Sequence, residues 1–165
     1  MPSEYFFRAL DAVYGTPDED LPYLYGVLTK EMSRRGMRMP ETGGLTPQEE
    51  LAGKAMVTLQ RGDNLVGWEM ALLAGVVTLF GTQFGKGEVE AFASRDVTNE
   101  LNRVQKTIAN ITSVMDTLQE RGLVETVEGD AKKGAHKSFK VTAKGEAETM
   151  RIWQRVCGTE KRGIA

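Results

Sequence analysis

The sequence has very few of the residues that build metal and catalytic sites. Cysteine and histidine each occur once in 165 residues, as Cys157 and His136. One thiol can form neither an intrachain disulfide nor a zinc site, which excludes a disulfide-stabilised secreted fold and fits a reducing cytoplasm. One histidine supports no credible Ser-His-Asp set, and Cys157 has no evident base. We therefore expect no enzyme activity, no metal and no cofactor.

The sequence also lacks the segments that enter membranes. Its N-terminus has no charged region followed by an apolar run, so no signal peptide is expected. The most apolar stretch, residues 65–81, contains Glu69 and is shorter than the roughly 20 apolar residues that a membrane span needs. We expect this stretch to be a buried helix, and the protein to be cytoplasmic and without membrane contact.

Proline is missing from the larger part of the chain, because all five prolines lie in the first 47 residues. The charged fraction of 27% and the hydrophobic fraction of 41% are ordinary for a globular protein. We expect an N-terminal helical region at 1–64 and a second domain at 65–165. Thr46, Pro47 and Glu49 strongly predict a helix start within the first region, since they suit the N-cap, the first turn and a capping box.

The segment 94–139 carries the most specific pattern. We expect a short helix at 96–102, capped by Ser94, and after a tight connection a longer helix that begins at Thr107. Gly122 suits the left-handed position that ends such a helix. An apolar stripe at the i, i+3, i+4, i+7 spacing predicts the buried face of the longer helix: Ile111, Val114, Met115 and Leu118.

Strand patterns follow that helix. Residues 124–127 and 138–141 read as two strands joined by a lysine-rich turn, and 88–93 holds a short first strand. The expected fold is mainly α with a small antiparallel β-hairpin. Two helices at a sharp angle followed by a hairpin are the organisation that lays the second helix in a DNA major groove.

These residues resemble a known family. The segments 115–125, 132–137 and 141–146 are similar to winged helix-turn-helix domains, most of all to the bacterial MarR-like transcriptional regulators. The resemblance extends over roughly residues 68–157 and implies a winged helix-turn-helix domain preceded by N-terminal helices. In MarR-like proteins the terminal helices build the dimer, which implies that 3–35 and 146–157 do so here. The chain departs from the family in its long N-terminal third and its short C-terminal helix.

The candidate DNA-binding residues lie on the longer helix and on the hairpin. Asparagine can contact adenine through two hydrogen bonds, threonine and serine can reach bases or phosphates, and lysine suits phosphates. Asp116 and Glu120 would repel DNA if they faced the groove. The helix and the connection before it are predicted to contribute Arg103, Lys106, Thr107, Asn110, Thr112 and Ser113. The hairpin is predicted to contribute Lys132, Lys133, His136 and Lys137.

The distribution of charge agrees with this interpretation. Residues 1–94 hold 8 Lys and Arg against 13 Asp and Glu, whereas residues 95–165 hold 13 against 10. A nucleic-acid-binding protein keeps positive charge where the phosphates lie. The main prediction is a transcriptional regulator that binds double-stranded DNA as a homodimer.

Two other functions stay open. The domain could be a protein-interaction winged helix, a phage-encoded or polymerase-associated accessory factor whose acidic N-terminal region binds a protein partner. It could also sense a small molecule in a pocket beside the apolar helix 65–80. Six aromatic residues in the first 25 favour burial of that region in a homodimer: Tyr5, Phe6, Phe7, Tyr14, Tyr23 and Tyr25. The second helix expected there, 21–35, should place four apolar residues inward: Leu24, Val27, Leu28 and Met32.

Overall fold

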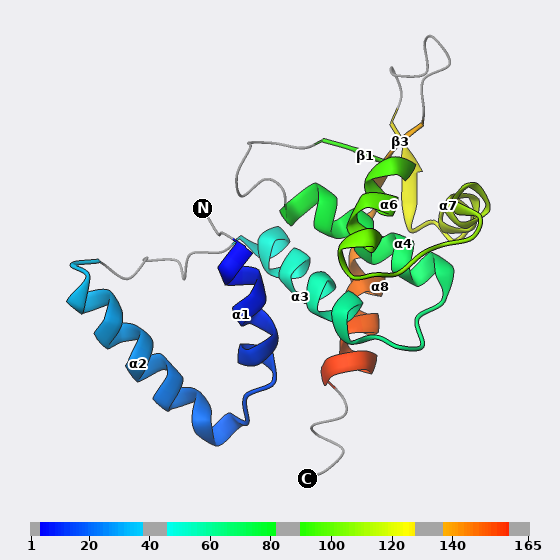
Figure 1. Ribbon diagram of the computed structural model, residues 1–165. Helices are drawn as coiled ribbons and strands as arrows, with labels where there is room; N and C mark the ends of the chain where they lie inside the picture. Colours follow the sequence, from blue (N-terminus) through cyan, green and yellow to red (C-terminus); the bar gives the residue numbers. More distant parts are fainter. Residues whose placement is uncertain (1–3, 38–45, 82–89, 128–136, 159–165) are drawn as a thin grey trace.

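The computed structural model describes residues 4–37, 46–81, 90–127 and 137–158 (Figure 1). This part of the chain is mainly helical and contains one small three-stranded antiparallel sheet, as the sequence predicts. The largest buried cluster joins the central helices to the sheet, and a smaller one joins the N-terminal helix to the C-terminal end.

The two expected N-terminal helices are present. They are α1 (Glu4–Tyr14) and α2 (Leu21–Arg34), separated by the single 3₁₀ turn η1 (Asp18–Asp20). Helix α1 packs on α3, and its Leu10 is buried. The ring of Tyr14 meets Trp153 edge-on, with 4.7 Å between the ring centroids. Helix α1 therefore belongs to the body of the molecule.

Helix α2 has the expected apolar side chains, but they are not inward. No residue of α2 is buried, and Leu24, Val27 and Leu28 are 43%, 67% and 53% exposed. Apart from η1, no described element packs extensively on α2, which Figure 1 shows set apart beside α1. The prediction that these side chains face inward is wrong for a single chain. Helical spacing shows that one side of α2 is apolar, but it does not show that another part of the chain packs on that side.

Helices α3 (Pro47–Arg61) and α4 (Gly67–Val76) pack against each other at the centre of the main core. The predicted capping box of α3 is confirmed: the Thr46 side chain accepts from the Glu49 amide at 3.1 Å, and the Thr46 amide donates to Glu49 at 2.9 Å. Helix α4 continues into the π-helical turn η2 (Val77–Gly81) and is buried almost all round, as the apolar stretch predicts.

The Thr46 cap gives a first prediction. Thr46→Ala removes the side-chain acceptor of the Glu49 amide and is expected to lower the free energy of unfolding by about 1 kcal/mol. Thr46→Ser keeps the acceptor and serves as the control. Urea denaturation followed by circular dichroism measures both, and equal stability of the two variants would contradict the role of the cap.

The two helices of the predicted motif are α6 (Ser94–Arg103) and α7 (Ile111–Glu120). Both begin differently from the prediction. The Asp96 side chain accepts from the Ala93 amide at 2.8 Å, so Ala93 rather than Ser94 is the N-cap residue of α6. Helix α7 begins after Asn110 instead of at Thr107. The connection between the helices turns through Gln105, whose φ is +60°.

The end of α7 agrees with the sequence. Gly122 has a φ of +75°, which favours glycine, and its amide donates to the Gln119 carbonyl at 3.0 Å. The Leu123 amide donates to the Leu118 carbonyl at 3.0 Å, which completes a Schellman motif, and Leu123 is buried. The predicted stripe also faces the core, because Met115 and Leu118 are buried while Ile111 and Val114 pack at its edge.

The sheet consists of β1 (Phe92–Ala93), β2 (Val124–Thr126) and β3 (Ser138–Val141) in the order β1-β3-β2. Strand β3 has the predicted bounds, and β2 ends one residue early. Phe92 lies opposite Phe139. The Phe92 ring packs so closely on α4 that a Cβ at Gly75 would lie 2.6 Å from it. Strand β1 is thereby held against the central helix.

Helix α8 (Ala143–Trp153) follows the sheet and ends in the π-helical turn η4 (Gln154–Gly158). The Thr142 hydroxyl caps α8 by accepting from the Gly145 amide at 3.1 Å, and it donates to the Gly122 carbonyl at 2.7 Å. Gly145 touches the hairpin: a Cβ there would lie 2.2 Å from the Leu123 carbonyl oxygen. The start of α8 is therefore held against the segment that follows α7 by a hydrogen bond and a close contact.

Candidate nucleic-acid interface

The outward face of α7 is polar. Opposite the buried Met115 and Leu118, the side chains of Thr112 and Ser113 are exposed in the first half of the helix. Asp116 and Glu120 are exposed in the second half. The first half is thus uncharged and lies at the positive end of the helix dipole, whereas the second half is negative. An anionic ligand would be attracted only to the first half.

Asn110 caps the start of α7, which the sequence did not predict. Its Oδ1 accepts from the Ser113 amide at 3.2 Å, which makes Asn110 the N-cap of α7. The carboxamide keeps its NH₂ group as a donor. Thr107, the expected cap, lies exposed in the connection before the helix.

Two of the predicted cations are engaged within the chain. Lys106 is half-buried, and its Nζ donates to the Gly62 carbonyl at 2.9 Å, at the end of α3. Arg103 lies 2.9 Å from Glu100 and is 53% exposed. Burial raises the pKa of Glu100, although the charge and hydrogen bond of Arg103 act in the opposite direction. Arg103 is therefore the more accessible of the two.

The hairpin contributes further cations. Lys137 is exposed directly before the returning strand β3, while the predicted Lys132, Lys133 and His136 lie outside the described residues. Lys140 of β3 is also exposed and lies opposite Glu125. The prediction did not include Lys140. The strand alternation could have found it, because Phe139 is buried and the next side chain must point to the other face.

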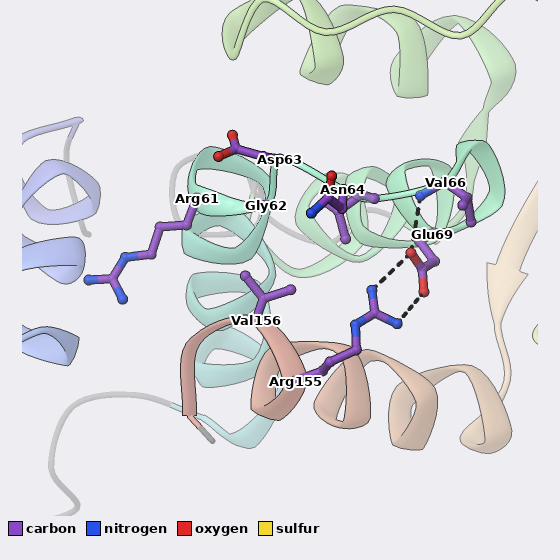
Figure 2. A pocket seen from close by; sticks show the side chains of 9 residues that line it. Arg61, Gly62, Asp63, Asn64, Val66, Glu69, Arg155 and Val156 are labelled. Atoms are coloured by element: carbon purple, nitrogen blue, oxygen red, sulfur yellow. Dashed lines mark hydrogen bonds and ion pairs between the residues drawn. The ribbon is translucent and has the colours of Figure 1, made fainter. Parts of the chain in front are cut away.

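A polar cavity of about 500 Å³ lies at the start of α4, between the α3–α4 connection and η4. Figure 2 shows Glu69 and Arg155 pointing toward each other across it, while Arg61 turns away toward α1. Arg155 donates to the two Glu69 oxygens at 2.8 and 3.0 Å, and Arg61 pairs with Asp11. The cavity therefore offers a ligand no free charge from these three side chains.

Glu69 is the one buried acidic residue of this region. Burial raises the pKa of its carboxyl, but the hydrogen bonds from Arg155 and the Val66 amide and the charges of Arg155 and Arg151 outweigh it. The net pKa of Glu69 is lower than usual. The carboxylate, which also accepts from the Val66 amide at 3.1 Å, connects the start of α4 to the π-helical turn η4.

The described residues contain no cluster of three His, Cys, Asp or Glu side chains that could hold a metal ion. None of the helices in the same ranges is both long and apolar enough to cross a membrane. No protein-family model, no curated protein and no solved structure matches the chain. Function must therefore be inferred from the residues themselves.

Proposed function

We propose that the protein is a transcriptional regulator that binds double-stranded DNA as a homodimer and catalyses no reaction. The observation that carries this proposal is the order α4-β1-α6-α7-β2-β3 with the sheet order β1-β3-β2. This order supports the proposal of a winged helix-turn-helix domain, in which α7 would be the recognition helix and the β2–β3 hairpin the wing. Such a regulator would act in the cytoplasm.

The exposed residues suggest how the contacts divide. The first half of α7 would enter the major groove, where Thr112, Ser113 and the free NH₂ group of Asn110 can meet base edges. The hairpin would follow the backbone, where Lys137 and the sequence neighbours Lys132 and Lys133 can meet phosphates. The remaining predicted contacts would flank the groove: Arg103, Lys106, Thr107 and His136.

The negative second half of α7 limits how deeply the helix can enter. Asp116 and Glu120 are exposed there, so a helix lying flat in the groove would bring carboxylates to phosphates. An inclined helix that inserts only its N-terminal half avoids this repulsion and directs its positive dipole end at the DNA. We therefore propose that α7 docks by its N-terminal half, before Asp116.

A test of the proposal measures binding to random duplexes at two salt concentrations. Affinity should fall with salt, and replacing Lys132, Lys133 and Lys137 together by alanine should reduce the slope of log affinity against log salt by about one unit per phosphate contact. Affinity for all sequences should fall alike. Salt-independent or absent binding by the parent protein would contradict the proposal, and a winged helix that binds proteins would take its place.

Base contacts require a variant that keeps the helix intact. Asn110→Ser retains an N-cap oxygen but loses the amide donor, so it should cost on the order of 1–3 kcal/mol on a selected site and little on other sequences. Thr112→Val removes a hydroxyl at nearly constant shape and should act in the same direction. Asp116→Asn is the control on the same face, and it should leave binding unchanged or tighten it.

A further inference from the structure

Helix α2 carries an apolar stripe that the described part of its own chain leaves uncovered. The stripe consists of Leu21, Leu24, Tyr25, Leu28 and Met32, at the helical spacing i, i+3, i+4, i+7, i+11. Leu21 and Tyr25 are 39% and 60% exposed, in addition to the two leucines described above. Contiguous apolar surface of this kind marks an interaction site on a folded protein.

The charges at the two ends of the stripe are opposite. The acidic end holds three consecutive carboxylates, in Asp18–Asp20. The basic end holds Lys30, Arg34 and Arg35, with Glu31 pairing with both arginines at 2.5 and 2.7 Å. This order suits the dipole of α2 itself. It also makes the surface complementary to a reversed copy of itself.

We propose that α2 of one copy packs antiparallel on α2 of a second copy, about a two-fold axis that passes between Tyr25 and Leu28. At about 1.5 Å per residue, the helix is roughly 21 Å long, so each acidic end would lie beside the basic end of the partner. Leu24, Tyr25 and Leu28 would occupy the centre, with Leu21 opposite the second copy's Met32. Each copy contributes the same surface residues to the contact, as a two-fold interface requires.

Three alternatives fit the surface less well. A parallel pair would place three carboxylates against three. A membrane-surface helix carries Lys and Arg along its polar face, whereas α2 begins beside Asp18, Glu19 and Asp20. A dimer through the N- and C-terminal helices together is disfavoured, because Leu10 of α1 already packs with Cys157 of η4 inside one chain.

This inference deepens the proposed two-fold DNA complex, yet its test requires no DNA. Light scattering should give about twice the chain mass of 18.2 kDa. Leu24→Ser combined with Leu28→Ser removes four leucines from the dimer and should weaken association at least about 100-fold. Thermal stability should persist, since no residue of α2 is buried. Tyr23→Ser is the control, because Tyr23 is 75% exposed and lies about half a turn from the stripe.

Salt dependence tests the antiparallel arrangement. Opposite charges face each other in that arrangement, so added salt should weaken the dimer, whereas it would strengthen a parallel one. Reversing the acidic end (Asp18→Lys with Asp20→Lys) or the basic end (Lys30→Glu with Arg35→Glu) should disrupt each homodimer, and mixing the two variants should restore a dimer. A monomeric parent, unchanged association after the leucine replacements, or a dimer strengthened by salt would overturn the proposal. If the protein forms this dimer but does not bind DNA, the proposed function is contradicted and the proposed dimer is not.

Discussion

Replacing Gly145 by alanine is expected to lower the free energy of unfolding by about 3–5 kcal/mol, a large part of the stability of a domain of this size. The added Cβ would lie 2.2 Å from the Leu123 carbonyl oxygen and 2.8 Å from a methyl carbon of Val141. The first contact is with backbone, so no side-chain rotation relieves it. Helix α8 would have to move away from the hairpin and strain the hydrogen bond from the Thr142 hydroxyl to Gly122.

The control for this variant is another helical glycine. Gly26 of α2 has no atom within 4 Å of the Cβ position, so Gly26→Ala should leave the core intact and add helix propensity worth about 1 kcal/mol locally. Replacing glycine by alanine would then lower the free energy of unfolding at position 145 and raise it at position 26. Thermal unfolding followed by circular dichroism compares them, and a Gly145→Ala protein as stable as the parent would refute the tight contact.

The second large effect is expected at the Glu69–Arg155 pair. The Glu69 side chain is 5% exposed and the Arg155 side chain 48%. Arg155→Met leaves the buried carboxylate with the Val66 amide as its remaining hydrogen-bond donor and should cost about 1–3 kcal/mol, less than for a fully buried pair because solvent reaches Arg155. Glu69→Gln keeps the shape and should cost less than Arg155→Met.

The pair also predicts a pH dependence. The folded-state pKa of Glu69 is lowered, so its stabilisation is complete above the ordinary glutamate range and is lost as the pH falls through the folded-state value. Acid should therefore reduce the stability of the parent more than that of Glu69→Gln. Urea denaturation at about pH 7 and about pH 3 measures the difference. A constant gap between the two proteins would show that the carboxylate is not selectively stabilised.

Local chemistry explains which elements could be predicted from the sequence. The Thr46 cap, the Gly122 terminus and strand β3 depend on residues that are neighbours in the chain, and the structure confirms all three. The start of α7 could not be predicted in the same way. Ile108 packs at the edge of the core and Lys106 reaches the Gly62 carbonyl, 44 positions away, so distant contacts keep the connection out of the helical conformation until Asn110.

The candidate site shows the same division. Exposure of Thr112 and Ser113 followed from the apolar stripe on the other side of α7, which the spacing defines. The engagement of Lys106 and the pairing of Glu69 with Arg155, 86 positions apart, depend on tertiary packing and left no local signal. The exposure of α2 shows a further limit, because a sequence identifies an apolar face but does not indicate whether its own chain covers it.

The cluster around Leu10 has a consequence for the order of events during synthesis. Leu10 packs with Val57 of α3 and with Cys157 of η4, and Cys157 is added to the chain long after Val57. At about 5–20 residues per second, Cys157 follows Leu10 by roughly 7 to 30 seconds. Helix α1 therefore lacks its contact with η4 for that time, whereas α2, which follows α1 along the chain, has already been synthesised. Adjacent nascent chains on one messenger could therefore meet through their N-terminal helices before either chain has closed its core.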